Sequence, residues 1–388
     1  MFKPITIILL VLSLLYIGYV VFEHFYYKAK RKKIKRVIHV NGIRGKSTTT
    51  RLIDAGLRAC GYKVFSKTTG TIPTYIDVDG IGHEIKRLGP ANVREQLKMI
   101  RLAANQNADV LVLECMAVNP ELQYITENNM LHADINVITN VRADHLDEMG
   151  SDLESIAYSL ANTTPTCGVV VLGEDKFKNV FDLCAAKKNS RTVVAKPYTG
   201  IDLMDTFAEN IAVALQVAEE MGCDKETFLQ GMKNYIHDPG ALSALRLGDS
   251  LLINGFSVND PDSILEVYGK ISEVADASQI TVLLNERADR VFRIEQHVEM
   301  LTKMQFKQVY ICGSNVLYVK KKLAQKGIRA TVLRDIAELA SCKVVFGCGN
   351  IFGQGMKTIK YYAGNGTDVG DAFAACQAVF QKEVDSDD

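Results

Sequence analysis

The sequence predicts an α/β protein with an N-terminal transmembrane helix, because three patterns follow one another along its 388 residues. An uncharged apolar run occupies residues 5–22. Beyond it, short apolar runs alternate with helix-like stretches, a rhythm that indicates repeated βα units around a largely parallel sheet. A second series begins after a turn cluster at residues 237–240. We therefore expect an anchor over residues 1–27, a parallel-sheet central domain over 28–237, and a smaller α/β domain with an acidic tail over 238–388.

The apolar run is about the minimum length for a helix that crosses the ~30 Å hydrocarbon layer of a bilayer. Seven Lys or Arg residues fall within residues 28–36, whereas Lys3 alone precedes the run. This excess of positive charge predicts a single-pass protein of the cell membrane whose catalytic domain is cytoplasmic. A cleaved signal peptide is the alternative, but the basic flank lies on the wrong side and no A-x-A site follows.

Charge and cysteine content argue against two broad classes of protein. Lys plus Arg and Asp plus Glu both number 45, so the overall charge gives no argument for nucleic acid as a partner. The nine cysteines include no CxxC pair, and most lie among apolar residues. This pattern predicts reduced thiols in the cytoplasm.

Short apolar runs set the expected strands of both domains. In the central domain they are residues 36–40, 63–65, 110–114, 135–138 and 169–172. The helices between them are expected to begin near Ser47, Asn92, Pro120 and Leu153, and a further helix to cover residues 206–221. The strands expected in the C-terminal domain are residues 251–253, 280–284, 308–311, 330–333 and 343–346. Gly61 follows the first helix, where a glycine cap is expected.

The strongest local signal is a glycine-rich turn between a predicted strand and a predicted helix. The strand at residues 37–40 runs into Asn-Gly-Ile-Arg-Gly-Lys-Ser-Thr-Thr at residues 41–49. Backbone N–H groups and the helix N-terminus in such a turn face a phosphate anion. Lys46 would reach the outer phosphates of a nucleotide, and Ser47 would bind Mg²⁺ through its hydroxyl. The full phosphate-loop pattern fails because Val40 occupies the first glycine position, and a chance Gly-Lys-Ser turn is the alternative.

Two further signals stand at the ends of predicted strands, at the sheet edge where open α/β proteins bind ligands. Residues 139–147 place His145 between aspartates, and its imidazole suits Mg²⁺ or an acidic substrate. Glu114 ends another strand and suits a divalent ion held against phosphates, whereas Cys115 beside it is assigned to packing. The alternative for His145 is a hydrogen-bonded surface turn, and the alternative for Glu114 is an acid that caps the following helix. The predicted metal ligands are therefore Ser47, Glu114 and His145.

These three elements, in this order and spacing, resemble the central domain of the Mur ligase superfamily, which includes folylpolyglutamate synthetase. Residues 42–47 match that family's phosphate loop, Glu114 its Mg²⁺-binding acid, and residues 139–147 its T-N-x-x-x-D-H-x-D motif. Asn210 lies in a stretch similar to the family's Asn-x-x-x-Ala helix near the adenine. The resemblance implies a P-loop-type central domain that covers most of the chain after the anchor. It implies catalytic roles for Lys46 and His145, and contacts to ATP from Gly42, Arg44, Gly45, Lys46, Ser47, Thr48 and Asn210.

A membrane-associated branch of that superfamily, the poly-γ-glutamate synthases, is more similar still. The matching segments, besides the N-terminal anchor, are residues 41–48, 61–63, 67–71, 114–120, 238–241 and 287–290. This resemblance implies that the γ-carboxyl of glutamate is activated and that poly-γ-glutamate is the product. It also implies membrane subunits of a synthesis and export complex as partners. Self-association into a homo-oligomer stays open.

The C-terminal domain departs from the Mur ligase pattern. Gly255 stands where those ligases have an Asp that positions the nucleotide, so another polar residue would have to take its place. Arg287 and Arg290 follow a predicted strand and could reach ATP phosphates or substrate carboxylates, with a solvated helix start as the alternative. Arg287 and Asp289 are the cofactor-binding residues expected in this domain. The glycine-rich residues 347–355 also follow a strand, and their place in a nucleotide cleft rests on the resemblance.

The sequence as a whole favours a membrane-anchored amide ligase that uses ATP and Mg²⁺. A substrate carboxylate would attack the γ-phosphate, and an amine would then displace phosphate from the acyl phosphate. Two other functions share the loop and the anchor: a membrane-linked kinase of protein or lipid, and a nucleotide-driven scaffold of an export complex.

Overall fold

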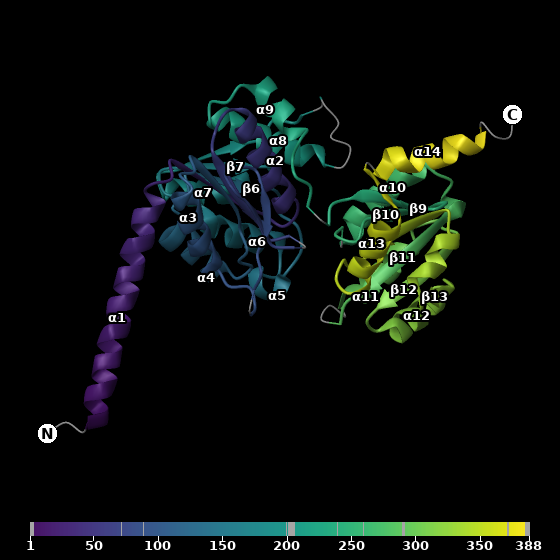
Figure 1. Ribbon diagram of the computed structural model, residues 1–388, viewed down its shortest axis with the longest axis horizontal. Coiled ribbons are helices and arrows are strands. Elements are labelled where there is room, and N and C mark those ends of the chain that lie inside the picture. Colours follow the sequence, from purple (N-terminus) through teal and green to yellow (C-terminus); the bar gives the residue numbers. More distant parts are fainter. Residues whose placement is uncertain are drawn as a thin grey trace. The chain divides into compact units, whose positions relative to one another are not determined.

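The computed structural model describes residues 4–70, 72–87, 89–198, 200, 206–238, 240–258, 260–288, 292–370 and 372–384. The chain forms two compact units, Met1–Ile236 and His237–Asp388, and each unit has its own sheet (Figure 1). Both sheets alternate with helices along the chain, which confirms the α/β class predicted from the sequence.

The first unit is built on an eight-stranded sheet with the order β4-β3-β2-β5-β1-β6-β7-β8. Its strands are β1 (Arg36–Asn41), β2 (Val64–Thr68), β3 (Thr74–Ile76), β4 (Gly82–Glu84), β5 (Val110–Glu114), β6 (Ile135–Ile138), β7 (Val169–Leu172) and β8 (Arg191–Val194). β1 pairs in parallel with both β5 and β6, and parallel pairing extends outward to β2, β7 and β8. The β3–β4 hairpin adds two antiparallel strands at one side. The carboxyl ends of β1, β5 and β6 therefore meet at one edge of the sheet.

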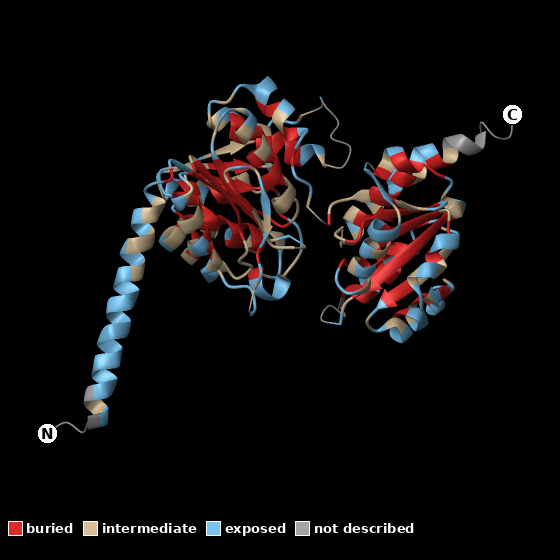
Figure 2. Cartoon of the chain, in the orientation of Figure 1, coloured by how far each residue is buried: buried red, intermediate tan, exposed pale blue. Residues whose placement is uncertain are grey.

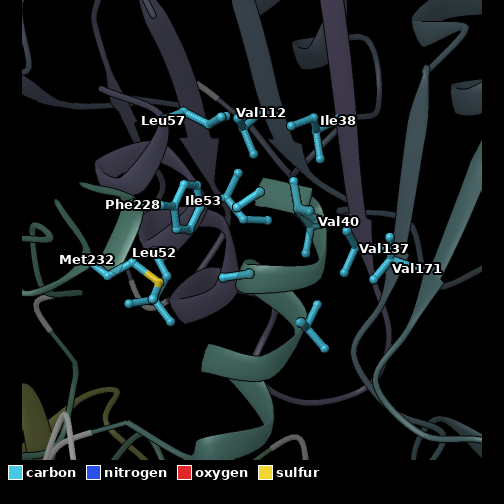
Figure 3. Close-up of a cluster of buried hydrophobic side chains, with 14 of the residues drawn as sticks. Ile38, Val40, Leu52, Ile53, Leu57, Val112, Val137, Val171, Phe228 and Met232 are labelled. Carbon is cyan, nitrogen blue, oxygen red and sulfur yellow. The ribbon is translucent and has the colours of Figure 1, made fainter. Parts of the chain in front are cut away.

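Helices cover both faces of this sheet. The helices of the first unit are α1 (Pro4–Arg31), which extends away from the sheet, α2 (Lys46–Ala59), α3 (Glu95–Asn105), α4 (Pro120–Ile125), the π-helix η1 (Thr126–Leu131), α5 (Leu146–Met149), α6 (Leu153–Leu160), η2 (Ala161–Thr163), α7 (Lys178–Ala186), α8 (Ala208–Glu220) and α9 (Lys225–Met232). Side chains of β1 alternate between the faces, as a strand requires. Ile38 and Val40 join a core with α2, α8 and α9, where Phe228 is fully buried (Figure 3). Val37 joins the opposite core, which includes Met99 of α3.

The ends of α2 explain why the chain turns there. Cys60 caps the helix, and Gly61 follows with a φ of 88°, which a glycine adopts without steric cost. The N–H of Tyr62 donates to the carbonyl oxygen of Leu57, and that of Gly61 to the carbonyl oxygen of Arg58. The glycine cap expected at Gly61 is thus confirmed.

α1 is long and apolar enough to cross a membrane, since an 18-residue window within Ile8–Arg31 has a mean hydropathy of 2.0. Its apolar side chains are exposed in the chain alone, as the pale blue colour along this helix shows (Figure 2). Among the described residues, the apolar window of this helix is 0% buried, which fits a hydrocarbon environment. Beyond the apolar run the helix continues to Arg31 and contacts α3.

The second unit has a seven-stranded sheet with the order β13-β12-β11-β14-β10-β9-β15. Its strands are β9 (Ser243–Leu247), β10 (Ser250–Asn254), β11 (Ile280–Glu286), β12 (Gln308–Gly313), β13 (Ala330–Val332), β14 (Val344–Cys348) and β15 (Thr367–Gly370). Its helices are α10 (Pro261–Val274), η3 (Ala277–Gln279), α11 (Phe292–Leu301), α12 (Val316–Gln325), η4 (Ile336–Ser341), α13 (Gln354–Asn365) and α14 (Ala372–Val384). The strands from β10 to β14 pair in parallel, whereas β9 and β15 are antiparallel additions.

The ten strands expected from apolar runs are all present, each within a few residues of the expected bounds. The expected helix starts are also present, although the helix predicted near Asn92 begins at Glu95. The β3–β4 hairpin, β8, β9 and β15 were not predicted, because they are short or half-exposed and carry no continuous apolar run.

Candidate active site

The turn between β1 and α2 has the shape of a phosphate loop. Gly42 and Gly45 have φ angles of 120° and 78°, and both positions are crowded. A Cβ on Gly45 would collide with the side-chain amide of Asn210, and one on Gly42 with Thr139. Both positions therefore require glycine for reasons of backbone conformation and of space.

The end of β6 supports this turn from the side. The side chain of Asn140 accepts from the N–H of Arg44 at 3.0 Å, and the hydroxyl of Thr139 donates to the carbonyl oxygen of Arg44 at 2.6 Å. The Arg44 guanidinium reaches further along the same motif and pairs with Asp144 at 3.1 Å. Residues 139–147 therefore hold the glycine-rich turn in place through their contacts with Arg44.

Lys46 begins α2 and bends back over the loop. Its Nζ donates to the carbonyl oxygen of Gly42 at 2.8 Å and to that of Ile43 at 3.2 Å. Burial lowers the pKa of the Lys46 ammonium, and the nearby Glu114 carboxylate partly opposes this shift. The ammonium lies over the part of the loop where phosphates would bind.

Ser47 and Glu114, which are distant in sequence, meet beside the loop. The Ser47 hydroxyl donates to Oε2 of Glu114 at 2.8 Å, and the backbone N–H of Thr69 donates to the same oxygen at 2.6 Å. Glu114 is 3% exposed at the carboxyl end of β5. A hydroxyl and a carboxylate are oxygen ligands of the kind that Mg²⁺ takes, alongside waters and substrate phosphates.

His145 lies at the same sheet edge, on the turn that follows β6. It caps the short helix α5 with a left-handed φ of 51°, and its side chain is 37% exposed. Its Nε2 is 3.9 Å from Oδ2 of Asp144, the carboxylate that binds Arg44. In the part of the chain that the structure describes, no group of three His, Cys, Asp or Glu side chains gathers in a metal-binding arrangement. A metal bound by Ser47 and Glu114 would therefore complete its shell with phosphate and water oxygens.

The remaining predicted contacts of the first unit lie on helices that flank the loop. Asn210 is buried on α8 and accepts from the Thr49 hydroxyl at 3.3 Å. Thr48 is half-buried in the first turn of α2. This arrangement fixes the Asn210 amide against Gly45, next to the N-terminus of α2.

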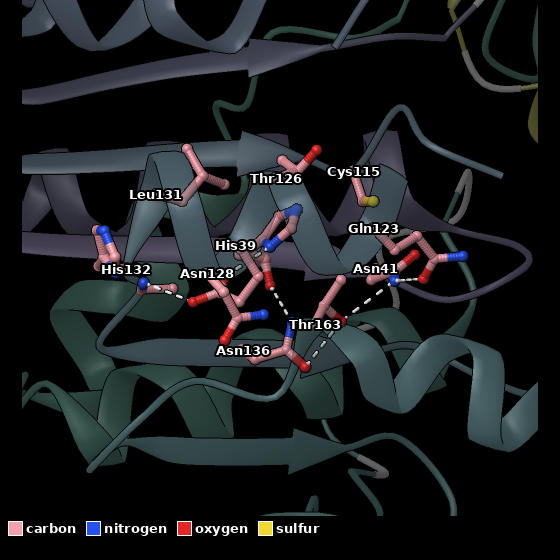
Figure 4. A network of polar contacts seen from close by, with 12 residues as sticks. His39, Asn41, Cys115, Gln123, Thr126, Asn128, Leu131, His132, Asn136 and Thr163 are labelled. Atoms are coloured by element: carbon pink, nitrogen blue, oxygen red, sulfur yellow. Dashed lines mark hydrogen bonds and ion pairs between the residues drawn. The ribbon is translucent and has the colours of Figure 1, made fainter. Parts of the chain in front are cut away.

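A buried polar network beneath the loop was not found by sequence reasoning (Figure 4). Asn41 accepts from the N–H of Gly42 at 2.8 Å and donates to Gln123 at the same distance, so it fixes the start of the turn. Two residues along β1, His39 bonds Glu127 of η1 at 2.9 Å. Burial alone would lower the pKa of His39, but the adjacent Cys115 thiol and Glu127 carboxylate raise it to about 9.

Thr69 and Lys67, at the end of β2, also belong to the site. Lys67 is fully buried and pairs with Glu95 at 2.8 Å, while Thr69 holds Glu114. The signal in the sequence was a strand that ends in Lys-Thr-Thr-Gly at the same sheet edge. A lysine in a strand ordinarily indicates an exposed face, which is why its burial was not foreseen.

The second unit carries its own polar edge. Arg287 stacks on the ring of Phe352 at 4.7 Å, and the Asn285 side chain donates to the carbonyl oxygens of Asn350 and Phe352. Asp289 lies outside the described residues. At Gly255, a Cβ would collide with Phe346 and Gly347, so close packing accounts for glycine at this position.

The first unit and the overall fold define the class of protein. The family model "Mur ligase middle domain" matches residues 40–214. A solved folylpolyglutamate synthase/dihydrofolate synthase from Yersinia pestis, complexed with AMPPNP and a Mn ion, has a TM-score of 0.64 and 18% identity. The match covers 87% of this chain and 90% of that one. The fold is thus that of the Mur ligases.

The particular family follows from the second unit and from whole-chain relatives. The family model "Poly-gamma-glutamate synthase CapB C-terminal domain" matches residues 244–365. The capsule biosynthesis protein CapB of Bacillus anthracis is 32% identical over 86% of this chain and 78% of its own. The PGA synthase CapB of Bacillus subtilis (strain 168) is 34% identical over 81% of this chain and 87% of its own. The chain belongs to the poly-γ-glutamate synthase CapB family, as the matching sequence segments predicted.

Proposed function

We propose that this chain is an ATP-dependent ligase that joins the activated carboxylate of one glutamate to the amine of another and so builds poly-γ-glutamate. Membership of the CapB family supports the substrate and the product. The observation that carries the site assignment is the contact between Ser47 and Glu114 at the mouth of the phosphate loop.

The chemistry proceeds in two displacements. A carboxylate oxygen of the donor glutamate bonds to the γ-phosphorus of ATP, and the bond from that phosphorus to the bridging oxygen breaks, which releases ADP. The nitrogen of the acceptor glutamate then bonds to the acyl carbon of the acyl phosphate. The carbon–oxygen bond to phosphate breaks, inorganic phosphate leaves, and the nitrogen loses a proton to form the amide.

The side chains of the loop serve the first displacement by position and charge, which is how phosphoryl transfer is mainly catalysed. Lys46 holds a positive charge over the loop, and backbone N–H groups at the start of α2 face the phosphates. Ser47 and Glu114 would hold Mg²⁺, with His145 as a further ligand or as a contact to substrate. The metal, when bound, would neutralise phosphate charge.

In the second unit, we propose that Arg287 and Asp289 contact the nucleotide or a substrate carboxylate. Arg287 is half-buried and kept in place by Phe352, so its orientation is limited before any ligand binds. A planar guanidinium fits carboxylate and phosphate groups through paired hydrogen bonds.

The membrane location belongs to the same proposal. α1 would cross the cell membrane once, and the basic residues after the apolar run would keep both units in the cytoplasm. Membrane subunits of a synthesis and export complex would receive the product, and nucleic acid is not among the expected partners.

One assay tests the proposal against a kinase or a scaffold. ADP release is measured with and without glutamate, and the same mixtures are searched for an amide product. A ligase releases ADP in step with γ-glutamyl bonds. ADP release that glutamate does not stimulate, with no amide formed, would contradict the proposal and favour a scaffold.

A further inference from the structure

The last turns of α1 are fixed to the first unit. The Arg31 guanidinium donates to the carbonyl oxygens of Leu131 at 2.6 Å and His132 at 2.8 Å, and pairs with Asp134 at 3.0 Å. Its side chain is 14% exposed. Just beyond, Ile34 is buried in the core with α3. The anchor is therefore a docked part of the unit, and its direction determines how the unit faces a membrane.

α1 and α3 run side by side in the same direction. Glu23 pairs with Arg94, just before α3, at 2.5 Å, and Lys30 donates to Asn105, at the end of α3, at 2.7 Å. Glu23 directly follows the apolar run of residues 5–22. The N-terminal end of α3 consequently lies nearest to the membrane that we propose α1 crosses.

The same end of α3 adjoins the active site. The Gln96 side chain donates to the carbonyl oxygen of Glu114 at 3.0 Å, and Glu95 binds Lys67 at the end of β2. The carboxyl edge of the sheet, where the phosphate loop lies, is thus on the membrane side of the unit.

Two adjoining depressions lie at this edge and share Asn92. One, of about 230 Å³, begins at Met116, two residues from Glu114, and reaches Glu148. The other, of about 280 Å³, continues from Asn92 to Lys86 and other basic side chains. Together they form a groove beside Arg94, between the strand end that carries Glu114 and the base of the anchor.

The charged side chains that line the far part of this groove are three cations and one carboxylate. Lys86 and Lys98 are exposed, and Arg87 binds Glu95 at 2.7 Å. Burial alone would raise the pKa of Glu95, but its bonds to Arg87 and Lys67 hold that pKa at about 2. The Glu95 charge is therefore already matched, whereas the ammonium groups of Lys86 and Lys98 face solvent and can attract an anion.

We propose that this groove binds the growing poly-γ-glutamate chain and leads it from the phosphate loop to the membrane surface beside α1. The inference rests on the proposed function, because each γ-linked residue of that product carries one free carboxylate. Exposed ammonium groups along a groove can bind a flexible polyanion at several of its carboxylates, which a single buried pocket would not do. The groove would thereby hold the polymer beside α1, where the protein enters the membrane.

The test compares two charge reversals in the full chain, held in nanodiscs of phosphatidylcholine. Lys86→Glu/Lys98→Glu changes the groove, and Lys63→Glu/Lys187→Glu changes two lysines that are also exposed, before β2 and after α7, at the opposite edge of the sheet. Binding of fluorescein-labelled γ-glutamyl decamer and dimer is measured by anisotropy at low and high salt. The groove variant should bind the decamer at least about tenfold more weakly and lose most of the wild-type preference for the longer chain. The control variant should stay within about twofold of the wild type.

Three results would overturn the groove. The first is wild-type decamer binding by Lys86→Glu/Lys98→Glu, and the second is an equal loss in both variants, which would indicate a general effect of charge. The third is a loss of binding to phosphatidylglycerol vesicles with decamer binding intact, which would assign the lysines to lipid. Amide formation from glutamate is assayed in parallel. If the wild-type chain formed no amide, the proposed function would be contradicted. The binding data would still show whether the groove binds the polymer.

Discussion

Both units end a parallel strand in a glycine turn that leads into a helix, but different side chains follow the two turns. In the first unit, residues 42–45 lead into Lys46, and Glu114 ends the neighbouring strand. In the second, residues 349–353 lead into Gln354, an uncharged residue. The second unit thus repeats the glycine turn of the first unit, but it has an uncharged residue where the first unit has Lys46. In the proposed function, the glycine turn would shape a site for an anion, whereas the lysine and the acid would select a metal-bound phosphate.

Buried histidines give a second comparison. His39 on β1 bonds Glu127 at 2.9 Å, and His297 on α11 bonds Glu286 at the end of β11 at 2.7 Å. All four side chains are nearly inaccessible. Each unit thus holds a polar pair within its core, and in the first unit that pair lies on the strand that carries the phosphate loop.

The largest effect is expected at Lys46, where the two loops differ most. Lys46→Ala should lower ligase turnover by about 10³-fold or more, because the ammonium group that lies over the loop is lost. Lys46→Arg should also fail, since a planar guanidinium does not replace a compact ammonium. Gln354→Ala, at the matching position of the second unit, should cost less than about tenfold. ADP release and circular dichroism are measured together, and a folded Lys46→Ala variant with normal turnover would remove the loop from the mechanism.

The next effect concerns the metal. Glu114→Gln keeps an acceptor for Ser47 but removes a charge, so the Mg²⁺ concentration for half-maximal ADP release should rise and turnover should fall by about 10²-fold. His145→Ala should act in the same direction but less strongly, because His145 is more exposed. Magnesium titrations of the two variants decide the assignment. Unchanged magnesium dependence in both would mean that neither residue binds the ion.

Local patterns made most of the fold and part of the site predictable. The ten strands that were predicted contain short apolar runs, and the turn at residues 42–45 is defined by neighbours in sequence. The sequence also placed Glu114 at a strand end on the edge of the sheet where the loop lies, because the carboxyl ends of parallel strands share one edge. By contrast, the buried charge of Lys67 is matched by Glu95, which lies on a separate helix and also binds Arg87, and no local pattern records this pairing.

Tertiary contacts also determine where the first helix ends. The sequence placed its boundary after Tyr27, where the apolar and aromatic residues stop. In the structure the helix continues to Arg31, because that guanidinium finds carbonyl groups and a carboxylate on the first unit. Edge strands such as β15 were not predicted for a related reason. Their pairing is set by the partner strand and not by hydrophobic residues of their own.

A smaller effect is expected from the glycines at the two ends of α2. Gly45→Ala should destabilise the first unit by about 2–4 kcal/mol and weaken ATP binding, because a left-handed φ and a collision with Asn210 act together. Gly61→Ala has a similar φ but open space around its Cβ, so its cost should be about 1 kcal/mol. Urea unfolding and nucleotide titration measure both quantities. Equal losses in the two variants would show that the contact with Asn210 does not matter.

The smallest effect is expected from the pH dependence of the stability that His39 gives to the first unit. The pKa of His39, raised from 6.5 to about 9 by Cys115 and Glu127 against the opposing effect of burial, means that the folded state holds this proton more tightly than the unfolded state. Its stabilisation is therefore complete below pH 6.5 and is lost as the pH rises through 9. Hydrogen exchange in β1 and η1, corrected for intrinsic rates, should show a loss of about 1–3 kcal/mol of protection between these values. His39→Gln should begin less protected and change little over the same range. A wild-type β1 that loses no more protection than the variant would show that His39 does not keep its proton in the folded state.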